Sequence, residues 1–490
     1  MGAAVSVDVS SLRRDSDWSA VRVGVLGLGI AGYACADSLT FLGANVVALD
    51  ERDSESLREK KKLLELLGAR VELGQPLSLP ADIDLLVVSP GLPPQHLVIE
   101  AALAAGIPVW GELELAWRLR DLDAPADWLC VTGTNGKTTT TQLTTAMLQA
   151  GGHRAASCGN IGTPILDCIR DPEGFDFLVV EISSFQLHYL GDVSPIASTV
   201  LNIDHDHIDW HGTFDAYKAA KGKVFANTKV AGIYNAGDAT TIKLLEDADV
   251  VEGCRAIGFT VGVPRVSEVG YSEDILCDRA FLENRKDEAL ELATLEDLGL
   301  IGVLTPHLLA NVAAASALAR ACDVEPAAIR SAIRDFRLDK HRIELVAEHA
   351  GITWIDDSKA TNPHATAASL SSFDSVVWIV GGLLKGVDIT PLVERFAKKL
   401  RGAVVIGKER DAVLAALASV APEIPVIEIN VEENSQVMPH AVEAASNLAQ
   451  AGDTVLLAPS SASMDQFKDY ADRGNQFAQA VRNLIGQADG

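Results

Sequence analysis

The sequence has few cysteines and no long apolar run, and both absences exclude classes of protein. Its seven cysteines are scattered, odd in number and contain no C-x-x-C pair. This pattern excludes a disulfide framework and a thiolate zinc site, and it predicts a reduced, cytoplasmic protein. No apolar run approaches the roughly 18 residues that span a bilayer, and the polar first twenty residues are unlike a secretory signal. We therefore expect no membrane partner.

Basic residues are also in the minority. Lysine and arginine total 41 against 67 aspartates and glutamates, which gives a net charge of −26. Without a long basic run such a surface repels nucleic acid, so we expect no nucleic-acid partner. An anionic substrate must instead be met by a few positioned cations. The hydrophobic content of 48% and the charged content of 22% exclude a disordered chain.

Short β-rich runs alternate with helical stretches, which is typical of parallel sheets built from βαβ units. We therefore predict an α/β protein, and 490 residues correspond to about three domains. A polar, proline-containing stretch at 120–127 and the segment 337–340 mark the boundaries. The predicted domains are 1–124, 125–338 and 339–490. Strands are predicted at 21–26, 45–49, 85–89, 128–131, 177–180, 198–203, 353–356, 376–380, 403–406 and 454–458, and helices at 31–42 and 308–321. No element is predicted in the charged, irregular segment 240–300.

A glycine-rich loop follows the strand predicted at 128–131 and precedes a helix. It reads Gly133-Thr134-Asn135-Gly136-Lys137-Thr138-Thr139. Backbone N–H groups of such a loop cradle phosphates, the lysine meets their charge, and a hydroxyl reaches Mg²⁺. Only two residues separate the two glycines, so the loop lacks the full Walker spacing. The motif predicts a phosphate-binding site.

A second glycine motif, Gly27-Leu28-Gly29-Ile30-Ala31-Gly32, follows the first strand, and Asp50 ends the next strand. Taken alone, this is a dinucleotide fingerprint with Asp50 near a ribose hydroxyl, as in an NAD-dependent dehydrogenase. The motif equally suits any nucleotide diphosphate at that helix N-terminus. A plain tight turn also satisfies it, so three interpretations stay open.

Carboxylates and histidines follow the strands beside the phosphate loop. Glu181 closes the strand 177–180, and Asp204-His205-Asp206-His207 follows the strand 198–203. The carboxyl ends of parallel strands share one sheet edge, where a carboxylate is a natural Mg²⁺ ligand. The histidine–aspartate run fits a zinc cluster or a solvated loop, but magnesium suits a phosphate site better.

Together these motifs resemble the Mur ligase family. The segments that carry the resemblance are 133–139, 181–187, Ala219-Ala220-Lys221, His341-Arg342 and Asp357-Ser358-Lys359-Ala360-Thr361-Asn362. Two late motifs, Ser463-Met464-Asp465-Gln466-Phe467-Lys468 and Arg473-Gly474-Asn475, are similar to the branch that adds D-glutamate. The resemblance runs through all three predicted domains in the family's order. Singly, Asp357 with Lys359 also fits a surface ion pair, and Ser463 an N-cap.

The resemblance implies a fold and a function. The fold would be a Rossmann-like N-terminal domain for a UDP substrate, a central P-loop-type ATPase domain with a parallel sheet, and a Rossmann-like C-terminal domain for D-glutamate. The function would be that of an ATP-dependent ligase of peptidoglycan precursor synthesis, acting through an acyl phosphate. Its small-molecule substrates would be UDP-N-acetylmuramoyl-L-alanine and D-glutamate, and we expect a monomer. An NAD-dependent dehydrogenase would leave the phosphate loop, Glu181 and the segment 357–362 without purpose. The presence of Lys137, Glu181, His207 and Lys221 argues against an inactive nucleotide-binding module.

The resemblance also assigns roles residue by residue. The implied catalytic residues are Lys137, Glu181, His207, Lys221 and Arg342. The implied ATP contacts are Gly133, Thr134, Asn135, Gly136, Lys137, Thr138, Thr139, Asn160, Asn311, Arg342, Asp357 and Lys359. The implied ligands of two Mg²⁺ ions are Thr138, Glu181, His207 and a Lys221 carbamylated by CO₂. The implied contacts of the UDP substrate are Gly27, Leu28, Gly29, Ile30, Ala31, Gly32, Asp50, Arg52, Ser89, Gly91, Asn160, Ser183 and Gln186. The implied contacts of D-glutamate are Thr361, Lys385, Ser463, Met464 and Tyr470.

Three positions depart from the family pattern. His307-Leu308 stands where His-Asn is usual, which removes one amide on the nucleotide side but retains Asn311. Gly381-Gly382-Leu383-Leu384-Lys385 replaces the commoner Gly-Gly-Asp-x-Lys and keeps its lysine. Tyr470 stands where phenylalanine is frequent.

Overall fold

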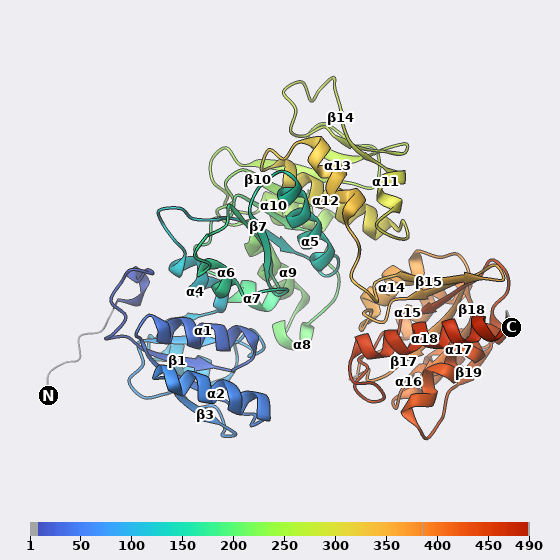
Figure 1. Cartoon of the computed structure of the whole chain (residues 1–490), viewed down its shortest axis with the longest axis horizontal. Helices are drawn as coiled ribbons and strands as arrows, with labels where there is room; N and C mark the ends of the chain where they lie inside the picture. The colour runs from blue at the N-terminus through green and yellow to red at the C-terminus, as the bar shows by residue number, and fades with distance from the viewer. Residues whose placement is uncertain (1–7, 385, 489–490) are drawn as a thin grey trace. The chain divides into compact units, whose positions relative to one another are not determined.

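The computed structural model describes residues 8–384 and 386–488 (Figure 1). In this part of the chain the strands form three sheets, of five, nine and six strands. The chain divides into two compact units, Met1–Thr294 with Ala310–Ile333 and Leu295–Leu309 with Arg334–Gly490. The first two sheets belong to the first unit and the third sheet to the second. The predicted α/β class is confirmed, and each sheet lies within one of the three predicted domain ranges.

The first sheet is parallel, with the order β3-β2-β1-β4-β5. Its strands are β1 (Arg22–Leu26), β2 (Asn45–Asp50), β3 (Arg70–Leu73), β4 (Leu85–Val88) and β5 (Val109–Trp110), and its helices are α1 (Ile30–Phe41), α2 (Glu55–Leu67), α3 (Leu97–Ala104) and α4 (Glu112–Leu119). The strand order reverses at β1, and a crevice for a ligand opens at the carboxyl end of such a strand. The glycine turn 27–32 begins directly after β1.

The second sheet has the order β14-β13-β12-β11-β10-β9-β6-β8-β7. Its strands are β6 (Asp127–Thr132), β7 (Ala155–Gly159), β8 (Phe177–Glu181), β9 (Ala197–Val200), β10 (Ala231–Asn235), β11 (Arg255–Phe259), β12 (Glu268–Ser272), β13 (Ile275–Asp278) and β14 (Leu290–Thr294). The helices along this part are α5 (Lys137–Ala150), α6 (Ile165–Ile169), α7 (Ser184–His188), α8 (Ile208–His211), α9 (Phe214–Gly222), α10 (Ala239–Glu246), α11 (Leu295–Gly299), α12 (Pro306–Arg320) and α13 (Pro326–Asp335). The order reverses at β6, which lies between β8 and β9, and the phosphate loop follows β6.

The segment 240–300, for which no element was predicted, contains four strands and two helices. Strand β12 pairs with β11 in parallel and with β13 in antiparallel fashion, and β13 pairs with β14 across a register shift. These strands are four or five residues long, and the charged residues lie largely in the turns between them. Runs this short contain too few residues to show the alternation of apolar and polar side chains that distinguishes a strand from a loop.

The third sheet has the order β15-β16-β20-β17-β18-β19, in which only β15 runs antiparallel to its neighbour. Its strands are β15 (Glu344–His349), β16 (Ile352–Asp356), β17 (Val376–Gly381), β18 (Leu400–Ile406), β19 (Val426–Glu428) and β20 (Thr454–Leu457), and its helices are α14 (Pro363–Ser371), α15 (Thr390–Phe396), α16 (Arg410–Val420), α17 (Val437–Leu448) and α18 (Tyr470–Ala488). Strand β20 lies between β16 and β17 and is parallel to both. The loops after β16 and β20 therefore begin side by side at one sheet edge.

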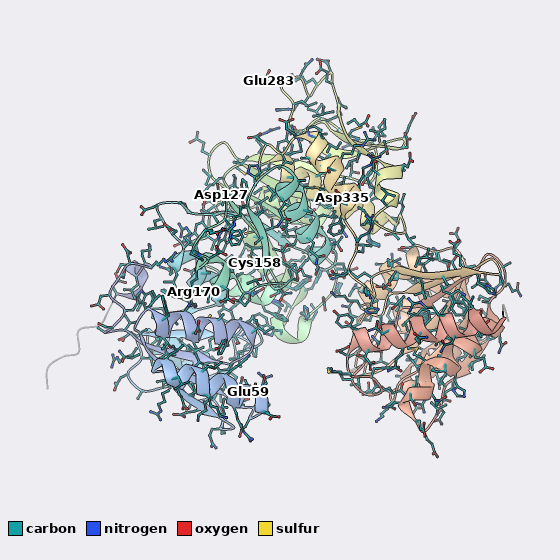
Figure 2. The ribbon with its side chains drawn as sticks, in the orientation of Figure 1. Glu59, Asp127, Cys158, Arg170, Glu283 and Asp335 are labelled. Carbon is teal, nitrogen blue, oxygen red and sulfur yellow. The ribbon has the colours of Figure 1, made fainter. Side chains whose placement is uncertain are left out.

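One hydrophobic core joins the first two sheets, and it includes Val25 of β1 and Val180 of β8. Trp117 and Trp128 meet edge to face across the predicted boundary at 120–127, with ring centroids 5.0 Å apart. Arg170, which follows α6 and is labelled in Figure 2, donates to Asp37 of α1 at 2.5 Å. The two sheets thus form one compact unit. Within the described ranges, no helix combines the length and apolar character needed to cross a membrane.

Candidate active site

The phosphate loop connects β6 to α5. Gly136 has φ +85°, and a Cβ atom there would lie 2.2 Å from the side-chain oxygen of Asn311. Both the backbone conformation and the close contact require glycine. The structure therefore brings Asn311 of α12 against the phosphate loop. On another side, the Asn202 side chain accepts from the Asn135 N–H at 2.8 Å and donates to the Asn135 carbonyl at 3.0 Å.

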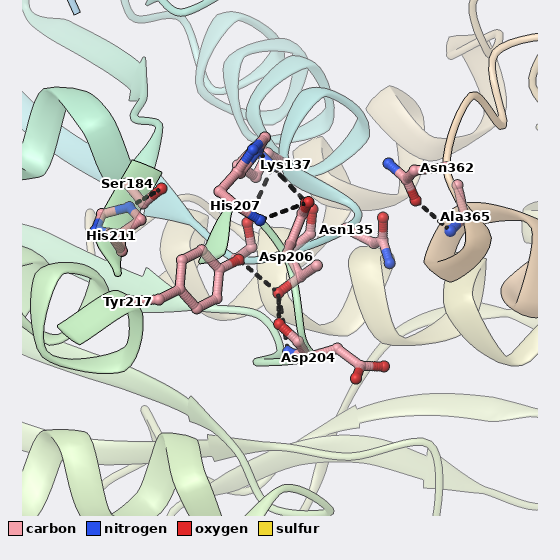
Figure 3. A network of polar contacts seen from close by, with 12 residues as sticks. Asn135, Lys137, Ser184, Asp204, Asp206, His207, His211, Tyr217, Asn362 and Ala365 are labelled. Carbon is pink, nitrogen blue, oxygen red and sulfur yellow. Dashed lines mark hydrogen bonds and ion pairs between the residues drawn. The ribbon is translucent and has the colours of Figure 1, made fainter. Parts of the chain in front are cut away.

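Lys137 begins helix α5, and its ammonium group lies against the loop. Its Nζ atom donates to the carbonyl oxygens of Gly133 and Thr134, each at 3.0 Å. The Thr134 hydroxyl is 2.9 Å from the Tyr217 hydroxyl and accepts from the Asp204 N–H at 2.9 Å (Figure 3). These bonds connect the loop with the segment after β9 and with helix α9, so both elements hold the loop in shape.

Lys221 of helix α9 is buried against the same loop, with 2% of the residue exposed. Its Nζ atom donates to the Gly133 carbonyl at 2.8 Å and to the Thr132 hydroxyl at 3.3 Å. Burial, and then the positive charge of Lys137, hold the pKa of the Lys221 amine well below its usual value. The neutral amine is therefore more populated than in an exposed lysine.

Glu181 ends β8, the parallel neighbour of β6, and is 2% exposed. Its Oε1 atom accepts from the Asn160 side-chain amide at 2.9 Å. Its Oε2 atom is buried and has no hydrogen-bond partner among the described residues. A buried carboxylate oxygen without a partner is costly, and a hard cation would satisfy it. Glu181 therefore fits the Mg²⁺ site predicted from the sequence.

His207 lies at the end of the predicted histidine–aspartate run, next to helix α8. It adopts a left-handed backbone conformation with φ +52°. Its Nε2 atom is 3.4 Å from Oδ2 of the neighbouring Asp206 (Figure 3). The centroid of its ring lies 4.6 Å from that of the Phe185 ring. With 46% of the side chain exposed, the ring remains accessible to a ligand. Among the described residues, three potential metal-ligating side chains lie within 4.8 Å of one another at His341, Glu344 and Asp356, and not in the histidine–aspartate run.

Two predicted substrate contacts form a helix cap. The Ser183 hydroxyl accepts from the Gln186 N–H at 3.2 Å, and the Gln186 side-chain oxygen accepts from the Ser183 N–H at 2.9 Å. This capping box begins helix α7 directly after Glu181. In the next residue, the Ser184 hydroxyl is 3.0 Å from Nε2 of His211. Ser183 and Gln186 thus have a structural role here whatever they bind.

The glycine turn after β1 is organised by Asp50. The buried Asp50 carboxylate accepts from the Leu28 N–H at 2.8 Å and from the Arg52 guanidinium at 3.0 Å. A Cβ at Gly32 would lie 1.8 Å from the Gly27 carbonyl, so the third glycine is required for packing. The Ser89 hydroxyl donates to that carbonyl at 3.1 Å. Asp50, which was predicted to face a ribose, is engaged here by the turn and by Arg52.

Arg342 lies in an unusual backbone segment of the second unit. Its neighbours His341 and Ile343 have φ values of +66° and +47°, in the left-handed region. The His341 Nδ1 atom is 2.7 Å from Asp356 Oδ2, and this buried pair attaches the segment to the end of β16. The Nε atom of Arg342 is buried, and no described residue is its hydrogen-bond partner.

Asp357 follows β16 and is buried. Its carboxylate accepts from the Ser369 hydroxyl. Burial raises the pKa of this carboxyl to about 6, although the Ser369 hydrogen bond and the charge of Arg342 act in the opposite direction. Lys359, two residues further, holds its Nζ atom 5.4 Å from the ring centroid of Tyr470.

The predicted D-glutamate contacts differ in exposure. Thr361, Met464 and Tyr470 are exposed, whereas Ser463 is buried. Lys385 lies outside the described residues. The sequence motif around Arg473 had no assigned role, and the structure supplies one. The fully buried Arg473 donates to the Ser358 hydroxyl at 2.9 Å, to the Ser358 carbonyl at 2.8 Å and to the Ser461 carbonyl at 3.2 Å, which ties the loops after β16 and β20 together.

Comparison with known proteins identifies the family to which the chain belongs. The chain matches the N-terminal domain of Mur ligases of the MurD-like type over residues 21–111, the Mur ligase middle domain over 131–319 and the Mur ligase glutamate ligase domain over 341–461. These matches follow the order of the three sheets. The chain belongs to the Mur ligase family, which confirms the resemblance predicted from its motifs.

Individual proteins of this family are similar to the chain over nearly its whole length. The UDP-N-acetylmuramoylalanine–D-glutamate ligase of Leifsonia xyli subsp. xyli is 53% identical over 489 residues, covering 96% of this chain and 94% of the relative. The ligase of the same name from Streptomyces avermitilis is 48% identical over 469 residues, covering 96% and 99%.

Solved structures share the fold at low identity. A pseudomurein peptide ligase type C from Methanothermus fervidus has a TM-score of 0.56 at 15% identity, covering 95% of this chain and 100% of that one. The MurF ligase from Thermotoga maritima in complex with ADP has a TM-score of 0.54 at 16% identity, covering 98% and 100%. These likenesses support the three-domain α/β fold predicted from the sequence.

Proposed function

We propose that this chain is an ATP-dependent ligase that joins D-glutamate to UDP-N-acetylmuramoyl-L-alanine and releases ADP and phosphate. Relatives that are 48–53% identical over almost the whole chain carry the name of that ligase. The observation that carries the proposal is the buried Oε2 atom of Glu181, on the strand beside the phosphate loop, which has no hydrogen-bond partner in the described part of the chain. A nucleoside triphosphate with its metal ion matches both features.

The reaction requires activation of a carboxylate. A carboxylate does not react with an amine at neutral pH, so the γ-phosphoryl group of ATP is first transferred to the alanyl carboxylate. The amine of D-glutamate then attacks the acyl phosphate, the amide bond forms, and phosphate leaves with the former carboxylate oxygen. Lys137 and Arg342 would offset the charge on the transferring group. Asp357 and Asn311 would position the nucleotide.

Metal ions are part of this proposal. Bound Mg²⁺ would neutralise charge on the phosphoryl oxygens. The Thr138 hydroxyl, Glu181 and His207 would hold two such ions, together with a modified Lys221. An unmodified ammonium beside these cations would be repelled. Addition of CO₂ to the neutral amine of Lys221, with loss of one proton, yields a carbamate with oxygen ligands of the kind Mg²⁺ prefers.

The proposed sites for the UDP substrate and for D-glutamate lie in loops after strands of the first and third sheets. The glycine turn after β1 would bind the UDP part of the substrate, and the loops after β16 and β20 would bind D-glutamate through Thr361, Lys385 and Ser463. The three predicted domains would thus bind UDP substrate, ATP and amino acid in chain order. We further propose that the protein acts in the cytoplasm as a monomer.

The test is phosphate release from ATP by the full-length chain. We expect release only when UDP-N-acetylmuramoyl-L-alanine, D-glutamate and Mg²⁺ are all present. L-Glutamate in place of the D-isomer is the matched control, and NADH absorbance is followed in parallel. Phosphate release that is independent of the UDP substrate, or a change in NADH absorbance, contradicts the proposal.

A further inference from the structure

Lys60 of helix α2 reaches back to the glycine turn that follows β1. Its Nζ atom donates to the Leu28 carbonyl at 3.0 Å and to the Gly29 carbonyl at 3.1 Å. The next two residues are also lysines, but Lys61 pairs with Glu65 at 3.6 Å along the helix and Lys62 is exposed. The helix therefore presents only the first of its three consecutive lysines to the turn.

The turn carries a second cation. Arg52 lies beside it, held by the Asp50 carboxylate, which also accepts from the Leu28 N–H. Burial, and then the charge of Arg52, lower the pKa of the Lys60 amine, whereas the charge of Asp50 raises it. Lys60 and Arg52 thus place two cations at the glycine turn of a protein with a net charge of −26.

The outer side of the turn is open. A Cβ atom at Gly29 would meet no described atom within 4 Å, and Ile30 is 74% exposed. The inner side, by contrast, is closed by the contact of Gly32 with the Gly27 carbonyl. Carbonyl oxygens repel an anion, but here the Lys60 ammonium covers those of Leu28 and Gly29. An ammonium has three donors, so one remains beyond these two carbonyls.

We propose that Lys60 is a substrate-binding residue that contacts the diphosphate of the uridine nucleotide and shields it from the carbonyls of the glycine turn. This inference rests on the proposed function for the identity of the nucleotide. It adds to that function an assignment within the nucleotide site: Lys60 and the backbone N–H groups of the turn bind the diphosphate, and other groups bind the base and ribose.

The experiment is a titration of the full-length chain with UDP and with uridine, which lacks the phosphates. The variant is Lys60→Met, which keeps the length of the side chain and removes its charge. The matched control is Lys62→Met on the same helix. We expect Lys60→Met to bind UDP about tenfold or more weakly, as for loss of a charge-assisted contact, and to bind uridine as the wild type does. ATP affinity should stay unchanged, and Lys62→Met should behave as the wild type.

Two results overturn the inference. One is unchanged UDP affinity in Lys60→Met. The other is an equal loss of UDP and uridine binding together with a lower melting temperature, because Lys60 would then only hold the turn in shape. Failure of the proposed function is distinguishable, because the wild type itself would then bind neither ligand and release no phosphate in response to the UDP substrate.

Discussion

The Nζ atom of Lys221 lies 2.8 Å from the carbonyl oxygen of Gly133, the first glycine of the phosphate loop. A buried amine is thereby placed against the loop that the sequence motif assigns to phosphate. The same amine is influenced by the charges of Lys137, Asp206 and Glu181. Lys221 is thus coupled to the proposed phosphate and metal sites at once, and its chemistry can be tested separately from theirs.

Replacing Lys221 by Arg should abolish most of the ligase activity. Arginine stays charged and cannot form a carbamate. In ¹³C-bicarbonate the wild type should show a carbamate resonance that Lys221→Arg lacks. The control is Lys218→Arg on the same helix, where the lysine pairs with Asp215 at 2.7 Å. Near-full activity of Lys221→Arg, or no carbamate resonance in active wild type, would remove the carbamate from the mechanism.

Replacing Lys137 by Ala should lower the rate of acyl-phosphate formation about a hundredfold or more, because a cation facing the transferring phosphoryl group is lost. The melting temperature should change little, because Lys137 is half-buried at the phosphate loop, at the edge of the sheet, and contributes little to the hydrophobic core. Lys243→Ala, at an exposed ion pair of α10, is the control. Rapid quench of single turnovers gives the rate, and a folded, fully active Lys137→Ala protein would contradict the phosphate-loop assignment.

Replacing Glu181 by Gln should raise the Mg²⁺ concentration needed for half-maximal activity by about tenfold or more. Glutamine keeps the shape and can still bond to Asn160, but it removes the charge that a hard cation requires. Glu173→Gln, at an exposed position, is the control. The measurement is phosphate release against Mg²⁺ concentration at fixed ATP. An unchanged Mg²⁺ dependence would show that Glu181 is not a metal ligand.

Replacing Glu112 by Gln should stabilise the protein above pH 7. Glu112 is 3% exposed, and its Oε1 atom finds no hydrogen-bond partner in the described part of the chain. Burial, and then the charge of Asp167, raise the pKa of this carboxyl from 4.5 to about 7. The folded protein therefore holds a proton that the unfolded chain releases above pH 4.5, so stability falls as the pH rises from 4.5 to about 7.

The expected gain for Glu112→Gln is about 2–3 kcal/mol at pH 8 and close to zero at pH 4. Urea unfolding at both pH values measures the difference, with the exposed Glu100→Gln as the control. A gain of equal size at both pH values would mean that packing, and not ionisation, separates the two side chains.

Local patterns were sufficient for the parts of the fold that carry the motifs. Strands β1, β6 and β8 are apolar runs that end directly at a glycine turn, the phosphate loop or Glu181, so their ends could be predicted. The strands β11 to β14 could not, because they are short and stabilised by pairing with segments distant in sequence. The strand predicted at 198–203 ends at Val200 in the structure. Asn202, which the prediction placed in the strand, instead bonds through its side chain to the phosphate loop, a segment distant in sequence.

The sequence by itself determined which motifs are present and in what order: the loop of glycines with Lys137, the carboxylate Glu181 and the histidine-rich segment, in the order typical of the family. These features are local, because a φ value or a charge belongs to a residue and its immediate neighbours. Only the tertiary structure decided which groups are buried and what they meet. Asp50 turns to Leu28 and Arg52 instead of to solvent, and Lys60 alone among three lysines reaches the glycine turn. Burial and charge pairing depend on contacts between segments far apart in the chain. They are therefore determined by the order of the strands in each sheet and by which face each helix turns toward its sheet.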